Sequence, residues 1–151
     1  MALTRTYPID TALQLEDGAG AHTSTFVGSG GVIDMGDANL HAAAIITTSV
    51  VKISANDETY AVEIQGSTDS GFAAASSFIL ATLNIGPNET NSATAGDVTT
   101  DTPAAGHYYV PFSNDFNGTT CRYIRIKTTM GGSSPNIQFV AHMTQARTMG
   151  E

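Results

Sequence analysis

The 151-residue sequence contains no tryptophan, a single cysteine and only six basic residues. Without a second cysteine no disulfide can form within the chain, which fits assembly in a reducing compartment such as the cytoplasm. With 14 acidic residues, the net charge is −8 at pH 7. This charge disfavours nucleic-acid binding, which needs a basic surface, and it disfavours contact with anionic membranes.

Charged residues and long apolar runs are also scarce. Charged residues make up 13% of the chain, about half the usual share, so Thr, Ser, Asn, Gln and Gly must supply the polar surface. No apolar run approaches the roughly 20 residues that span a bilayer, and the first residues lack the apolar region of a signal peptide. We therefore expect no membrane segment and no secretion signal, in one domain with a real core.

What the sequence does contain is apolar and polar residues in alternation, as in the segment that holds Tyr60, Val62 and Ile64. This period of two is typical of strands with one buried face. Strands are expected at residues 21–27, 32–35, 40–53, 58–65, 77–85, 107–112, 120–128 and 136–143. Glycine- and asparagine-rich turns separate them, and only residues 71–76 suit a short helical turn. The pattern predicts an all-β jelly roll or β-sandwich of about eight strands.

Both ends of the chain differ from the predicted domain at residues 21–143. Residues 1–20 have few apolar side chains and are expected to form an extended N-terminal arm, while residues 144–151 form a polar tail. Within the arm, Leu3, Tyr7 and Ile9 are candidate partner-binding residues. The alternative is that residues 10–15 pair as the first strand of the domain. The polar stretch at residues 88–105 predicts an exposed loop.

No group of residues has the spacing of a known catalytic or metal site. The four histidines, which lack metal-ligand spacing, are His22, His41, His107 and His142. Cys121 has no basic partner, since strand alternation points the neighbouring Arg122 away from it. The glycine-rich segment at residues 28–31 is interpreted as a hairpin loop. We expect no enzyme activity, no cofactor and no metal site.

A structural cation in an acidic loop is the alternative to that last expectation, because calcium prefers clustered oxygen ligands. The candidate pairs are Asp34 with Asp37, Asp57 with Glu58, and Asp97 with Asp101. None has the spacing of a known calcium loop, so solvated carboxylates are the default interpretation.

Half of the positive charge lies on one predicted strand, as Arg122, Arg125 and Lys127. Alternation places Ile124 and Ile126 inward. The outward side chains are then Tyr123, Arg125 and Lys127, and they are candidate partner-binding residues that could dock a carboxylate-rich surface. In the alternative interpretation they pair with acids on neighbouring strands, such as Glu63 or Asp115.

Several short sequence motifs occur in an order that resembles a known family. They are Gly31-Val-Ile-Asp-Met-Gly36, Val62-Glu-Ile-Gln-Gly-Ser-Thr-Asp-Ser-Gly-Phe72, Tyr108-Tyr-Val-Pro-Phe112, Arg122-Tyr-Ile-Arg-Ile126 and a last strand at residues 137–143. Together they resemble the capsid cement, or decoration, proteins of tailed bacteriophages, over roughly residues 11–143. The resemblance rests on strand motifs and transfers no catalytic residue.

This resemblance implies a jelly roll that sits on the outer capsid surface of the virion after synthesis in the host cytoplasm. The implied partner is the major capsid protein, whose subunits the protein would bridge to stabilise the expanded head, and the implied state is a homotrimer. The motif at Arg122 also resembles discoidin-like carbohydrate-binding domains, although this chain lacks their tryptophan and paired cysteines. In that alternative Tyr108, Tyr109 and Tyr123 would contact a cell-surface glycan.

Overall fold

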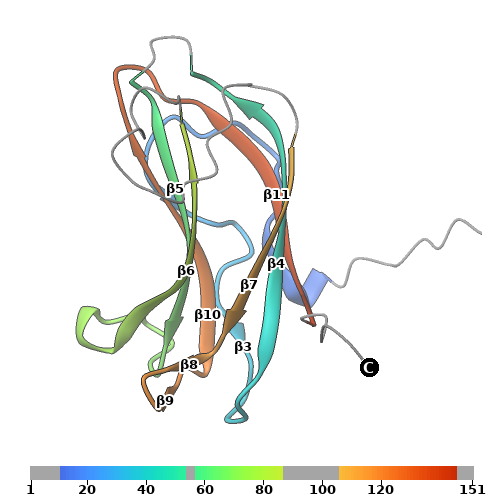
Figure 1. Cartoon of the computed structure of the whole chain (residues 1–151), viewed down its shortest axis with the longest axis vertical. Coiled ribbons are helices and arrows are strands. Elements are labelled where there is room, and N and C mark those ends of the chain that lie inside the picture. Colours follow the sequence, from blue (N-terminus) through green and yellow to red (C-terminus); the bar gives the residue numbers. More distant parts are fainter. Residues whose placement is uncertain (1–10, 54–56, 87–105, 146–151) are drawn as a thin grey trace, which may run out of the picture.

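A computed structural model of the chain describes residues 11–53, 57–86 and 106–145, and these residues fold into two antiparallel sheets (Figure 1). The candidate arm residues Leu3, Tyr7 and Ile9, the predicted loop at 88–105 and its pair Asp97 and Asp101 lie outside the described residues. No helix among the described residues is long and apolar enough to cross a membrane.

The first sheet, sheet A, has the strand order β1 (Gln14–Glu16), β11 (Ile137–Gln145), β4 (His41–Val51) and β7 (Gly106–Ser113). In sheet B, β10 (Tyr123–Gly131) lies between β5 (Thr59–Ser67) and the two short strands β2 (Phe26–Val27) and β3 (Ile33–Asp34), and β6 (Ser77–Ile85) is the far edge. The remaining elements are the hairpin of β8 (Asp115–Phe116) and β9 (Thr119–Thr120), and two 3-10 turns, η1 (Thr11–Leu13) and η2 (Ala74–Ser76).

The order of these strands is that of a jelly roll. Strands β2 and β3 both pair antiparallel with β10, at different positions along it, so they act as one interrupted edge strand. With that edge counted once, eight strands remain outside the small hairpin, four in each sheet, and the chain winds between the sheets. The predicted all-β fold of about eight strands is confirmed.

The core lies between the sheets and is built from the inward positions that the alternation predicted. Tyr60, Val62 and Ile64 of β5 face Ile137 and Phe139 of β11, and all five are buried. The short turn at η2 lies within the segment 71–76 that the sequence predicted, and a tight turn joins β8 and β9. In that hairpin Asn117 and Gly118 have φ of 51° and 82°, the left-handed region that this dipeptide tolerates.

The predicted boundaries of the domain need correction at both ends. Strand β1 pairs with β11, and Leu15 is 0% exposed within the core, so residues 14–16 belong to the domain and not to an arm of residues 1–20. The alternative of a first strand at residues 10–15 is correct in pairing this segment with the domain, although the strand covers residues 14–16 and residues 11–13 form the 3-10 turn η1. At the other end, Thr144 continues β11 opposite Ala43, so the domain extends past residue 143.

The glycine-rich segment at residues 28–31 is not the hairpin loop that the sequence predicted. It interrupts the β2–β3 edge and joins the two sheets, because Gly28 N–H donates to the carbonyl of Ile126 while Gly30 N–H donates to that of Leu15. Glycine is required by this close approach. A Cβ on Gly30 would lie 1.9 Å from the carbonyl oxygen of Gln14.

Candidate functional site

The outward side chains Tyr123, Arg125 and Lys127 form a row, the basic row, on the outer face of sheet B. Along β10, Ile124 and Ile126 point into the core and are fully buried, while Tyr123, Arg125 and Lys127 are half-buried on the opposite side. The predicted orientation of all five side chains is therefore confirmed. Whether the outward row can bind a partner depends on what its charges already contact.

Arg125 is used within the protein. Its Nε donates to Oε1 of Gln65 on β5 at 3.0 Å, and Nε2 of Gln65 in turn donates to Oε2 of Glu63 at 2.8 Å. The guanidinium also lies 4.1 Å from the centre of the Phe72 ring, and burial lowers the pKa of Arg125. These contacts pre-order the row. The contacts of Arg125 thus fit the alternative interpretation, in which the basic residues pair within the protein. The partners of Arg125 are Gln65 and Phe72, however, and not the acids Glu63 or Asp115.

Lys127 differs from Arg125 in this respect. Its position on β10 is opposite Glu63 on β5, and within the described part of the chain it makes no hydrogen bond or ion pair. The carboxylate of Glu63 is held toward Gln65 instead. Among the described residues, no carboxylate binds the ammonium of Lys127.

Arg122 precedes β10 and holds the loop before β4. Its Nε and Nη2 donate to the two carboxylate oxygens of Asp34, each at 2.8 Å, and Nη1 lies 3.4 Å from Asp37. The hydrogen bond from Arg122 holds the pKa of Asp34 below its usual value, and Arg122 has a raised pKa for the same reason. Asp34 and Asp37, which the sequence allowed as cation ligands, thus form ion pairs with Arg122.

The second candidate pair for a cation, Asp57 and Glu58, also has other surroundings within the protein. Asp57 accepts hydrogen bonds from the backbone and hydroxyl of Ser133, which lower its pKa, and Glu58 is fully buried. Across residues 11–53, 57–86 and 106–145, no group of three or more His, Cys, Asp or Glu side chains could hold a metal ion.

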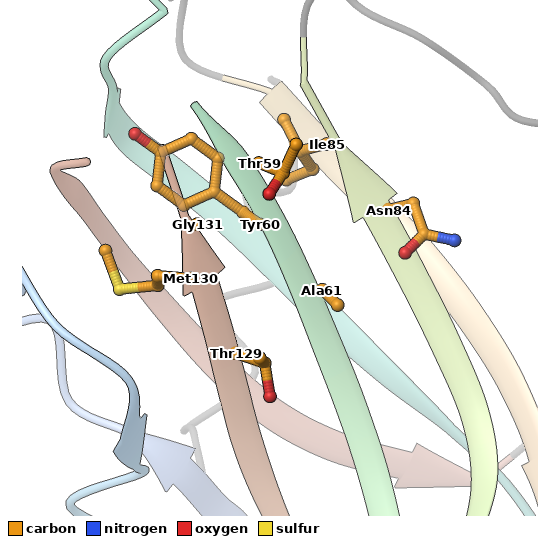
Figure 2. A pocket seen from close by; sticks show the side chains of 8 residues that line it. All are labelled: Thr59, Tyr60, Ala61, Asn84, Ile85, Thr129, Met130 and Gly131. Carbon is orange, nitrogen blue, oxygen red and sulfur yellow. The ribbon is translucent and has the colours of Figure 1, made fainter. Parts of the chain in front are cut away.

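A shallow hollow of about 270 Å³ lies farther along sheet B, where residues of β10, β5 and β6 line it (Figure 2). Thr129 of β10, Ala61 of β5 and Asn84 of β6 are aligned across it in register, and the small Ala61 leaves the space. Its full lining is Thr59, Tyr60, Ala61, Asn84, Ile85, Thr129, Met130 and Gly131. The hydroxyl and amide groups suit hydrogen bonds to a docked polar side chain, because each of them can both donate and accept.

Cys121 is fully buried, and this burial raises the pKa of its thiol. A raised pKa keeps the thiol protonated, which is unsuited to a nucleophile. The neighbouring Arg122 is directed to Asp34, and both Cys121 and Arg122 precede β10, so strand alternation does not apply to them.

The three tyrosines considered for glycan binding do not form one platform. Tyr108 packs against the core, and its neighbour Tyr109 stands on the outer face of sheet A. Tyr123 lies on the outer face of the other sheet. A platform of several aromatic rings needs them on a shared face, and this arrangement separates the three tyrosines.

One cluster was missed by the sequence analysis. Glu16, only 1% exposed, accepts a hydrogen bond from the Ser29 N–H at 2.7 Å and lies 3.2 Å from Nε2 of His22. The ring of His22 stacks on that of Phe26, with centroids 3.5 Å apart. No local pattern could have revealed this cluster, because an acidic residue before Asp-Gly is typical of a surface turn.

No family model and no curated protein matches this chain.

Proposed function

We propose that this protein is a capsid decoration protein, which binds the outer surface of the expanded head of a tailed bacteriophage and bridges subunits of the major capsid protein. The observation that carries the proposal is an eight-stranded jelly roll whose sheet B presents a pre-ordered basic row beside a polar hollow. The order of the strand motifs, which resembles that in capsid cement proteins, supports the same role. The role is structural, without a catalytic step, and its site of action is the virion surface.

The outer face of sheet B is the surface we assign to the capsid. Arg125 and Gln65 are already fixed by mutual contacts, so docking would cost little side-chain entropy there. Lys127 would meet a carboxylate of the shell, and the hollow around Ala61 would accept a polar side chain. Such contacts are individually weak, and a homotrimer multiplies them through effective concentration.

A second contact is proposed for the first residues of the chain. Leu3, Tyr7 and Ile9 supply apolar side chains ahead of β1, and among the described residues Leu15 is the first of the buried core. Deleting residues 2–9 should leave the fold intact and weaken head binding. Unchanged affinity together with unchanged heat stability of the decorated heads would remove the arm from the proposal.

Co-sedimentation with expanded heads that lack a decoration protein tests the assigned surface. Lys127→Glu should weaken binding about tenfold or more, because facing like charges costs several kcal/mol at an interface. Lys52→Glu is the matched control, since Lys52 donates to Ser134 in a different loop. Equal loss in both variants, or in neither, would contradict the assignment to sheet B.

A further inference from the structure

The outer face of sheet A carries no charged side chain from its three long strands. Strands β4, β7 and β11 contain no Asp, Glu, Lys or Arg. The short β1 contributes only Glu16, whose carboxylate is buried against Ser29 and His22. For a chain with a net charge of −8, three long neighbouring strands without a charged residue are a marked exception.

Apolar, aromatic and uncharged polar groups occupy the outward positions of these strands. In register across the sheet, Tyr109 of β7 is opposite Ile45 of β4, which is opposite His142 of β11. Tyr109 is 47% exposed, and further along β4 Val50 is 38% exposed. The neighbouring row consists of His107, Thr47 and Val140.

We propose that the outer face of sheet A is the surface through which one copy of this protein contacts another. Two copies that each carry a charge of −8 repel one another wherever carboxylates face each other. Contact through an uncharged face avoids that repulsion and removes Ile45, Tyr109 and Val50 from water. This inference rests on the proposed function for its homotrimer, in which the outer face of sheet A of each copy would pack against the neighbouring copies around a threefold axis.

The size of the face sets the strength of the expected association. Strands of about nine residues rise about 3.3 Å per residue, and the three long strands lie about 4.8 Å apart. The face therefore measures about 30 Å by 14 Å, below the roughly 800 Å² per partner of a standard interface. Association should be weak in dilute solution and favoured by the high local concentration on a capsid.

Sedimentation velocity of the full chain from micromolar to millimolar concentration tests this inference. The wild-type sedimentation coefficient should rise with concentration. Ile45→Glu and Tyr109→Glu should each weaken association about tenfold or more, because they place like charges on a desolvated contact. Ile79→Glu is the control, since Ile79 is 51% exposed on β6 of the other sheet. Circular dichroism and thermal melting establish that each variant is folded.

The outcomes separate this inference from the proposed function. A wild-type protein that stays monomeric throughout, or glutamate variants that associate as the wild type does, would overturn it. If Tyr109→Glu left self-association unchanged but abolished head binding, the face would belong to the capsid contact and the inference would be wrong. Failure of the wild type to bind heads would reject the proposed function without altering the sedimentation result.

Discussion

The guanidinium of Arg125 lies 4.1 Å from the centre of the Phe72 ring, on the outer side of sheet B. Phe72 is only 7% exposed, yet it is absent from the cluster of side chains that forms the core. Its φ of 52° is in the left-handed region, which costs a non-glycine residue about 1–2 kcal/mol. The contact with Arg125 helps to offset this cost and holds the loop between β5 and β6 against the sheet.

Replacing Arg125 with Met should therefore lower the free energy of unfolding by about 1 kcal/mol, the size of a partly desolvated cation–π contact. Urea denaturation measures this change, and hydrogen exchange should become faster in the loop at residues 68–76. Lys127→Met is the matched control, expected within about 0.5 kcal/mol of wild type as a surface substitution. Equal stability of the two variants would show that the Arg125 contact does not hold the loop.

Gly30→Ala should destabilise the protein by about 2 kcal/mol or more, as overpacking against a rigid neighbour does. The added Cβ would lie 1.9 Å from a backbone oxygen of Gln14, and a backbone atom cannot turn aside as a side chain can. Gly20→Ala is the control, because no atom lies within 4 Å of the position of its Cβ. Thermal unfolding of both variants provides the comparison, and similar melting temperatures would contradict the joint between the two sheets at residues 28–31.

The thiol of Cys121 should react slowly with a disulfide reagent in the native protein and quickly in urea. Burial, and to a smaller extent the nearby charge of Asp115, raise the pKa of Cys121, so little thiolate is present at pH 7. A colour-forming thiol assay with and without urea measures both rates. Rapid and complete labelling of the folded protein would show that this side chain is accessible.

The ion pair between Arg122 and Asp34 should make stability depend on pH. The hydrogen bond from Arg122 lowers the pKa of Asp34, so its stabilisation is present above the ordinary value of 3.8 and is lost as the pH falls through the lower folded-state pKa. Asp34→Asn should thus be less stable than wild type at pH 7, and the difference should vanish in strong acid. Denaturation series at several pH values measure this difference.

Asp37→Asn is the control for that series, since it removes only the longer 3.4 Å contact with Arg122. Its effect at pH 7 should be the smaller of the two. A wild-type advantage over Asp34→Asn that grew as the pH fell would have the wrong sign for this ion pair.

Local patterns predicted much of the fold because one buried face forces a period of two. Tyr60, Val62 and Ile64 were assigned to the core on that ground, as was the outward direction of Arg125. The same patterns could not predict contacts between distant segments. Arg122 meets Asp34 from 88 positions away.

Burial of polar residues was equally hidden from sequence. Glu16 is enclosed only because the glycine-rich segment brings the Ser29 N–H to it from the other sheet. Phe72 is covered by the outer side of a sheet, which an alternation rule assigns to solvent. Both cases depend on how loops cross between layers, and loop paths leave no periodic signal.

Cryo-electron microscopy of expanded heads mixed with the purified protein tests the central claim most directly. We expect regular density on the outside of the shell that fits the jelly roll, with sheet B and Lys127 facing the major capsid protein. Decorated heads should also resist heating better than bare heads. Heads that remain bare at saturating protein concentration, with an unchanged disruption temperature, would contradict the proposal.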